Sequence, residues 1–187
     1  MLQLETYQHQ WKVEFEQLRQ VISELLKGIS ATIEHVGSTA IPGMIAKPIL
    51  DIDIIPEHKE SLAEISKKLE RAGYRSKGDQ GIPGRFAFRQ NNQFTPVTEQ
   101  EIKWMSHHLY VCYANSLALK NHLLFRDALL NDEQLVQNYH QLKKDLLAEK
   151  GMTRETYNKR KTEFILSVLA GRGLTKEELV EIRQANK

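Results

Sequence analysis

Residues 35–55 read HVGSTAIPGMIAKPILDIDII, and two features of this stretch decide how the rest of the chain is interpreted. A turn at Gly37, Ser38 and Thr39 follows a short apolar strand, and two aspartates, Asp51 and Asp53, stand one residue apart within an apolar run. Side chains alternate along a strand, so the two carboxylates share one face. Paired carboxylates are costly to bury alone, and Mg²⁺ is typically bound by one or two carboxylates together with substrate phosphates. Because the turn offers N–H groups and hydroxyls to phosphate oxygens, the stretch predicts a metal–phosphate site.

The composition is that of an ordinary globular protein. The chain has 187 residues, of which 41% are hydrophobic and 27% are charged, and this length suits one domain or a domain with a substantial extension. The formal net charge is +2, because 26 basic residues stand against 24 acidic ones. This balance does not single out nucleic acid, so we do not expect a nucleic-acid partner.

The chain carries no signal for export or membrane insertion. Residues 1–17 contain no apolar signal core, and no apolar run is long enough to span a bilayer. Cys112 is the only cysteine, which rules out an internal disulfide and a cysteine-based zinc site and fits a reducing compartment. We therefore expect a cytoplasmic protein with no membrane partner, and the sequence leaves the oligomeric state open.

Hydrophobic periodicity predicts a mixture of helices and strands over residues 1–115. Apolar residues at helical spacing indicate helices at 7–28 and 57–72, and we interpret the apolar stripe of the first as core packing. Short β-type runs predict strands at 31–36, 49–55 and 106–113, with two more inside 74–92 around the loop 78–84. The apolar residues around the two aspartates favour a central place in the sheet for the strand 49–55.

From residue 116 onward the pattern is helical throughout. We expect helices at 117–130, 132–149, 154–170 and 176–184, and we find no internal repeat and no low-complexity segment. The chain therefore divides into an α/β core at residues 1–115 and a C-terminal helical region at 116–187, packed on that core.

The turn and the aspartate pair together resemble a known signature. Gly37-Ser38, followed on the next strand by Asp51 and Asp53, resembles the nucleotidyltransferase superfamily, and residues 35–54 closely resemble the GrpB family. The resemblance covers nearly the whole chain, continuing in Arg85-Phe86, HHLYV at 107–111, FRDALL at 125–130, residues 139–143, Tyr157, Lys161 and Phe164. It implies an α/β (α+β) fold with a nucleotidyltransferase-like mixed β-sheet, flanking helices and, here, a C-terminal helical extension. It also implies that strand carboxylates hold two metal ions and that a nucleotidyl group moves from a nucleoside triphosphate to an unknown acceptor.

The resemblance assigns the metal and catalytic roles to three residues. Asp51 and Asp53 are the expected metal ligands, with Mg²⁺ or Mn²⁺ as the cofactor. The superfamily commonly supplies a third carboxylate from a later strand, but the strand 106–113 contains none. His108 takes that place as a metal ligand or as a general base, because imidazole titrates near neutral pH and suits Mn²⁺ or Zn²⁺ better than Mg²⁺.

The expected phosphate-binding residues combine the turn with basic side chains. Gly37, Ser38 and Thr39 would hold the β- and γ-phosphates, and Lys47 would neutralise phosphate as a point charge. Three further basic residues would reach the site from the sheet and the C-terminal helices: Arg85, Lys143 and Lys161.

These assignments have structural alternatives. The Gly-Ser-Thr segment is also consistent with a tight turn alone, and the aspartate pair with the exposed face of an edge strand. His107 and His108 are also consistent with a buried and a surface histidine, and Lys143 and Lys161 with a solvated helix face.

The function has alternatives as well. The first is a noncatalytic module that binds a nucleotide or another phosphorylated small molecule. The missing third carboxylate favours it, and the fusion of some family members to dephospho-CoA kinase links it to coenzyme A metabolism. A structural or interaction protein is a further alternative, in which neither aspartate affects any ligand response.

Overall fold

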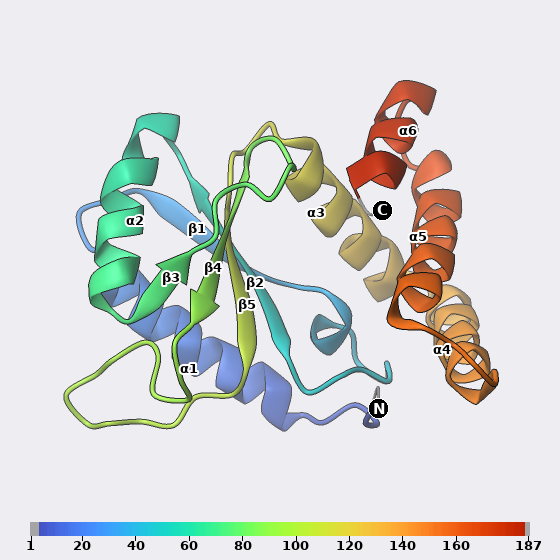
Figure 1. The fold of residues 1–187 in the computed structure, drawn as a ribbon, viewed down its shortest axis with the longest axis horizontal. Helices are drawn as coiled ribbons and strands as arrows, with labels where there is room; N and C mark the ends of the chain where they lie inside the picture. Colours follow the sequence, from blue (N-terminus) through green and yellow to red (C-terminus); the bar gives the residue numbers. More distant parts are fainter. Residues whose placement is uncertain (1–3, 186–187) are drawn as a thin grey trace.

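The computed structural model describes residues 4–185 and shows one five-stranded sheet with helices on both faces (Figure 1). The elements in chain order are α1 (Gln10–Leu25), β1 (Ala31–Val36), η1 (Ser38–Ala40), β2 (Leu50–Pro56), η2 (Lys59–Ser61), α2 (Leu62–Arg71), β3 (Tyr74–Ser76), β4 (Arg85–Gln90), β5 (His107–Cys112), α3 (Leu117–Leu130), α4 (Glu133–Ala148), α5 (Arg154–Ala170) and α6 (Lys176–Ala185). The strand order is β1-β2-β5-β4-β3, in which β2 and β5 are parallel and the other pairs are antiparallel. The predicted mixed α/β fold is therefore confirmed.

The strand β2 has a hydrogen-bonded neighbour on each side, β1 and β5. The alternative in which Asp51 and Asp53 lie on an exposed edge strand is therefore wrong. The apolar residues between and after the aspartates fill one face of an internal strand, as their pattern predicted.

Three helices have ends that differ from the prediction, and two of these differences have a local reason. The helix expected at 57–72 begins at Leu62, because His58 is extended and the 3₁₀ turn η2 follows it. The helix expected from 132 begins at Glu133, because Asp132 is its N-cap and accepts a hydrogen bond from the Leu135 N–H. The first helix is shorter than predicted, at Gln10–Leu25.

The sheet has one strongly apolar face. Leu50, Ile52 and Ile54 of β2 are fully buried there, beside Leu109 and Val111 of β5. Residues of α1 and α2 complete the same core, namely Trp11, Phe15, Leu18, Ile22, Ile65 and Leu69. Burial of this face stabilises the sheet and leaves the aspartates on the opposite face.

The opposite face of the sheet is polar. Strand register places Asp51 opposite His108, Asp53 opposite Tyr110, and Arg85 opposite Cys112. The helix α3 contacts the sheet at β1, and α4, α5 and α6 pack around α3 on its far side from the sheet (Figure 1). The C-terminal helices therefore close over the polar face.

The loop after β1 anchors the C-terminal helices. Ile41 and Met44 of this loop are buried against Leu129 of α3 and Tyr139 of α4, in a cluster separate from the main core. This packing brings α4 and α5 to the Gly-Ser-Thr turn.

The division of the chain at residues 115 and 116 stays a prediction. None of the helices between residues 4 and 185 has the length and apolar character needed to cross a membrane.

Candidate active site

The turn after β1 lies directly against Asp51. Gly37 has φ 71° and ψ −171°, a backbone conformation that is essentially restricted to glycine. A Cβ atom at this position would stand 2.2 Å from Oδ2 of Asp51. The turn can therefore approach the carboxylate only because residue 37 lacks a side chain.

Asp51 is the accessible aspartate of the pair. Its side chain is 33% exposed, and Oδ1 accepts a hydrogen bond of 2.9 Å from Nδ1 of His108, whose side chain is 55% exposed. When Nδ1 carries the proton in neutral imidazole, Nε2 is the nitrogen that can accept one. The pair can therefore offer both a carboxylate and a proton acceptor to a molecule in the adjoining pocket.

A pocket of about 290 Å³ joins the turn to the aspartate and the C-terminal helices. Among the residues that line it are Ser38, Thr39, Lys47, Asp51, His108, Lys143, Arg154 and Lys161. Seven of these eight were predicted from the sequence, and Arg154 was not. The predicted set is thus largely brought together, with Gly37 beside it.

Lys143 crosses from α4 to the turn. Its Nζ donates hydrogen bonds to Oγ of Ser38 at 2.6 Å and to the backbone oxygen of Ile45 at 2.8 Å, and it lies 4.4 Å from the ring centre of Tyr139. The residue is 2% exposed. The alternative of a solvated helix face is therefore wrong for Lys143, because the loop after β1 folds over it.

The lysines of the pocket are electrostatically destabilised as cations. Burial and the neighbouring Lys161 hold the pKa of Lys143 well below its ordinary value. Burial also lowers the pKa of Lys161 and, together with Arg154, that of Lys47, while Asp51 opposes both shifts. An anion bound here would relieve this repulsion.

Thr39 is more deeply buried than a residue that contacts phosphate in the pocket needs to be. It is 2% exposed, and its Oγ1 is 3.0 Å from Nε2 of His35. Burial lowers the pKa of His35 to about 4, so this imidazole is neutral at physiological pH. The hydroxyl of Thr39 therefore supports the turn through His35, whereas Ser38 stands at the pocket with Lys143.

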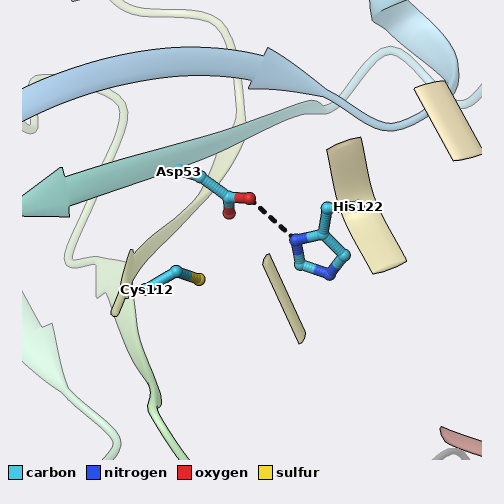
Figure 2. Close-up of side chains that lie close together, drawn as sticks. All are labelled: Asp53, Cys112 and His122. Carbon is cyan, nitrogen blue, oxygen red and sulfur yellow. Dashed lines mark hydrogen bonds and ion pairs between the residues drawn. The ribbon is translucent and has the colours of Figure 1, made fainter. Parts of the chain in front are cut away.

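Asp53 is buried and faces a different set of residues (Figure 2). It is 0% exposed, and Oδ2 accepts a hydrogen bond of 2.8 Å from Nδ1 of His122 on α3. The other oxygen, Oδ1, is buried without a hydrogen-bond partner among the described residues. Burial lowers the pKa of His122, but the Asp53 carboxylate more than offsets this, so the pKa of His122 is raised.

Cys112 completes this second group. In the part of the chain that the structure describes, one set of three possible metal ligands has all its ligand atoms within 4.8 Å of one another: Asp53, Cys112 and His122. Burial raises the pKa of the Cys112 thiol, with Asp53 adding to the effect. This set differs from the predicted one of Asp51, Asp53 and His108, which stays a prediction.

Arg85 lies outside the pocket beside Asp51, in another pocket of about 310 Å³ that His122 also lines. Its guanidinium carbon lies 4.7 Å from the ring centre of Tyr110. The basic side chain therefore stands near Asp53 and not near Ser38. Its predicted role in phosphate binding is not supported by any contact with the turn.

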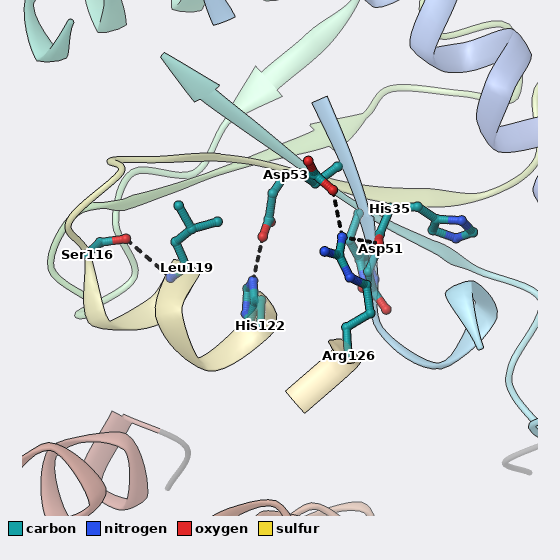
Figure 3. A network of polar contacts seen from close by, with 9 residues as sticks. His35, Asp51, Asp53, Ser116, Leu119, His122 and Arg126 are labelled. Carbon is teal, nitrogen blue, oxygen red and sulfur yellow. Dashed lines mark hydrogen bonds and ion pairs between the residues drawn. The ribbon is translucent and has the colours of Figure 1, made fainter. Parts of the chain in front are cut away.

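Arg126 is a further basic residue beside the site, and the sequence pattern does not single it out. Arg126 of α3 donates to Oε2 of Glu34 at 2.6 Å and to the backbone oxygen of His35 at 3.1 Å (Figure 3). Neither His122 nor Arg126 carries a local signal, because both belong to an unremarkable helical pattern. Only the packing of α3 on the sheet gives them a role.

The fold and the site place the protein in a recognisable class. The structure of Cid1 in complex with the UTP analog UMPNPP is similar, with a TM-score of 0.58 over 88% of this chain and 49% of that chain, at 17% identity. At this identity the similarity shows the fold, which is nucleotidyltransferase-like.

A family model described as "GrpB protein" matches residues 1–170, and the chain belongs to the GrpB family. The crystal structure of the conserved protein GrpB from Enterococcus faecalis is similar, with a TM-score of 0.73 and 29% identity over 96% of this chain and 98% of that one. The UPF0157 protein YqkA of Bacillus subtilis is 30% identical over 159 residues, which is 85% of this chain. This chain spans 43% of the length of YqkA.

Proposed function

We propose that the pocket beside Asp51 binds a nucleoside triphosphate and that the protein transfers a nucleotidyl group from it to an acceptor. One observation carries the proposal: three lysines line a pocket that Asp51 and the glycine-dependent turn also border. Backbone N–H groups, a hydroxyl and several cations beside a carboxylate form a typical phosphate site. The fold similarity to Cid1, which is described with a UTP analog, supports testing UTP first.

The aspartates fit a divalent cation. Asp51 is partly exposed at the pocket, and Asp53 keeps a buried carboxylate oxygen that has no hydrogen-bond partner within residues 4–185. Oxygen ligands of this kind suit Mg²⁺ or Mn²⁺, and such an ion would neutralise charge on the phosphate oxygens. The chain itself would position the phosphates with Ser38 and Lys161, and it would exclude water with α4 and α5.

His108 has the geometry of a general base. It is hydrogen-bonded to Asp51 through Nδ1 and half exposed beside the pocket. The carboxylate fixes the tautomer that leaves Nε2 able to accept a proton from an acceptor hydroxyl. His108→Gln would then lower turnover more than nucleotide affinity, which steady-state kinetics can separate.

The test is ligand-induced thermal stabilisation, measured with each nucleoside triphosphate plus Mg²⁺ or Mn²⁺. A nucleotide at about a hundred times its Kd adds about 2.7 kcal/mol to stability, which for a chain of this size raises Tm by roughly 2–4 °C per kcal/mol. We expect this rise in the wild type and its loss in Asp51→Asn and Lys161→Ala.

A matched control lies on the same helix. Lys159 of α5 is exposed and does not line the pocket, so Lys159→Ala keeps the net charge of Lys161→Ala and should retain the full rise. A panel of acceptors with labelled nucleotide then measures transfer. Stabilisation that is equal in all three variants, or absent with every nucleotide, would contradict the proposal.

A noncatalytic binding module is the second candidate, and a specific observation favours it. The strand β5 provides no third carboxylate, and Asp53 is already bonded to His122. In this case the pocket binds a nucleotide or another phosphorylated metabolite through the lysines alone. Binding would then persist in Asp51→Asn and without a divalent ion, and no acceptor would be modified.

A further inference from the structure

Three elements bring Asp53, Cys112 and His122 together. Asp53 comes from the middle of β2, Cys112 is the last residue of β5, and His122 lies in the second turn of α3. Their side chains point toward one another (Figure 2), and their ligand atoms all lie within 4.8 Å. Oxygen, sulfur and nitrogen donors this close require little movement to share one ion.

A second observation is that one oxygen of this cluster has no hydrogen-bond partner among the described residues. This oxygen is Oδ1 of Asp53, a residue that is 0% exposed. A buried carboxylate oxygen in this state is strongly unfavourable. The nearby cation, Arg85, lies over the ring of Tyr110 and donates from Nη2 to Oε1 of Gln80, and its buried Nε has no hydrogen-bond partner among the described residues, so Arg85 does not satisfy Oδ1 of Asp53.

The donor set selects the kind of ion. Thiolate and imidazole are ligands of Zn²⁺ and related borderline ions, and they are poor ligands for Mg²⁺. The thiolate of Cys112 and the carboxylate of Asp53 together balance a divalent charge, with His122 neutral. Binding requires that the thiol proton leave to solvent and that the ligating nitrogen of His122 carry no proton, so the proton that Nδ1 donates to Asp53 must move to Nε2 or also leave to solvent.

The site also has a route for entry. His122 lines the pocket of about 310 Å³ beside Arg85 and Asn121, so one ligand borders open space while the other two are buried. With three protein ligands, a tetrahedral ion would keep one position for water or for a molecule in that pocket.

We propose that Asp53, Cys112 and His122 form a binding site for one zinc-class divalent transition-metal ion, distinct from the Mg²⁺ or Mn²⁺ proposed with the nucleotide. Asp53 belongs to both sites, and a carboxylate can serve two cations with its two oxygens. The proposal does not rest on nucleotidyl transfer, because binding of this ion needs neither Asp51 nor the lysines.

The experiment uses the full chain, stripped with a chelator and studied without nucleotide. Co²⁺ replaces Zn²⁺ as a spectroscopic probe, because tetrahedral Co²⁺ has visible absorption and a thiolate ligand adds a near-ultraviolet charge-transfer band. We expect one equivalent of Co²⁺ with that band, displaced by one equivalent of Zn²⁺ and not by excess Mg²⁺. The wild-type spectrum alone tests the proposal, so it does not depend on any variant folding.

Variants then assign the ligands. Cys112→Ser should abolish the thiolate band, and both Cys112→Ser and His122→Gln should weaken Zn²⁺ binding by more than about 100-fold, beyond the loss typical of a merely supporting residue. His108→Gln is the matched control, because His108 also bonds to an aspartate through Nδ1 but lies outside the cluster. It should keep both the band and the affinity.

The result that would overturn the proposal is also clear. No stoichiometric Co²⁺ or Zn²⁺ binding by the wild type would do so, as would a spectrum without a thiolate band or affinity unchanged in folded Cys112→Ser. Asp51→Asn separates this proposal from the nucleotide site, because it should keep Zn²⁺ binding while losing the stabilisation by nucleotide and Mg²⁺. Failure of one experiment therefore does not decide the other.

Discussion

Asp51 and Asp53 are separated by one residue and share one face of a strand, yet they occupy different environments. Each accepts a hydrogen bond from Nδ1 of a histidine, at 2.9 Å from His108 and at 2.8 Å from His122. The Asp51 side chain is 33% exposed beside the pocket that Ser38 and the lysines line, whereas Asp53 is fully buried beneath α3. The two hydrogen bonds have nearly the same length, but their loss is expected to change the stability of the protein by different amounts. The reason is that the free-energy cost of an unpaired carboxylate depends on its burial.

The largest expected effect compares the two histidines directly. His122→Ala should destabilise the metal-free protein by about 3 kcal/mol, the lower end of the range for a broken buried pair, since it strands a buried carboxylate. His108→Ala should cost about 1 kcal/mol or less, because both partners of that pair reach solvent.

Urea unfolding in the presence of a chelator measures both values, and unchanged m-values would show that the two variants unfold from the same compact state. Equal losses of stability in the two variants would mean that burial does not distinguish the Asp51–His108 pair from the Asp53–His122 pair.

A smaller effect on stability is expected at the turn that lies against Asp51. Gly37→Ala forces a side chain into a glycine-only conformation and places a Cβ atom 2.2 Å from the Asp51 carboxylate. We expect a loss of about 2 kcal/mol from backbone strain, together with loss of the nucleotide-dependent rise in Tm.

Gly43 provides the control for this change. Gly43 has φ 78° and nothing within 4 Å of an added Cβ, so Gly43→Ala keeps the conformational cost without the collision. If Gly43→Ala weakened nucleotide binding as much as Gly37→Ala, the contact with Asp51 would not be what matters.

The smallest effect at neutral pH is expected for Lys143→Met, which preserves the volume of the side chain. The hydrogen bonds lost to Ser38 and Ile45 are offset by removal of a buried charge, so the net change should be less than about 1 kcal/mol. The pH dependence is more informative. Burial and Lys161 lower the pKa of Lys143 from its ordinary value of 10.5.

Between the lowered folded pKa and 10.5, the unfolded chain binds more protons than the folded one, so this lysine makes the stability rise with pH. The rise is absent below the folded pKa and complete above the unfolded one. Urea unfolding from about pH 7 to about pH 10 should therefore show a steeper increase for wild type than for Lys143→Met. Parallel profiles would indicate that Lys143 is not a destabilised cation in the folded state.

The sequence was sufficient to predict the fold and many of the residues around Asp51. Strand alternation predicted that Asp51 and Asp53 share a face, and the family resemblance added His108. The register between β2 and β5 places His108 opposite Asp51. The glycine turn was recognisable because its chemistry is local. Lys143 and Lys161 were identified only through the family resemblance, and for Lys143 the helix pattern alone favoured solvent, wrongly.

The sequence did not predict the group formed by Asp53, Cys112 and His122. His122 lies 69 residues from Asp53 along the chain. A single cysteine excludes a zinc site built from several cysteines, but it does not exclude the mixed set of Asp53, Cys112 and His122 that is proposed above. Their approach depends on how α3 packs across the sheet, which no local pattern reports.

By itself, the sequence determined which residues form strands and helices and which side chains share the polar face, because the strand period and the helix period are local properties of the chain. Only the tertiary structure decided which aspartate meets solvent and which is buried beneath α3. Burial is set by the elements that pack over a residue, and here those elements come from more than sixty residues further along the chain.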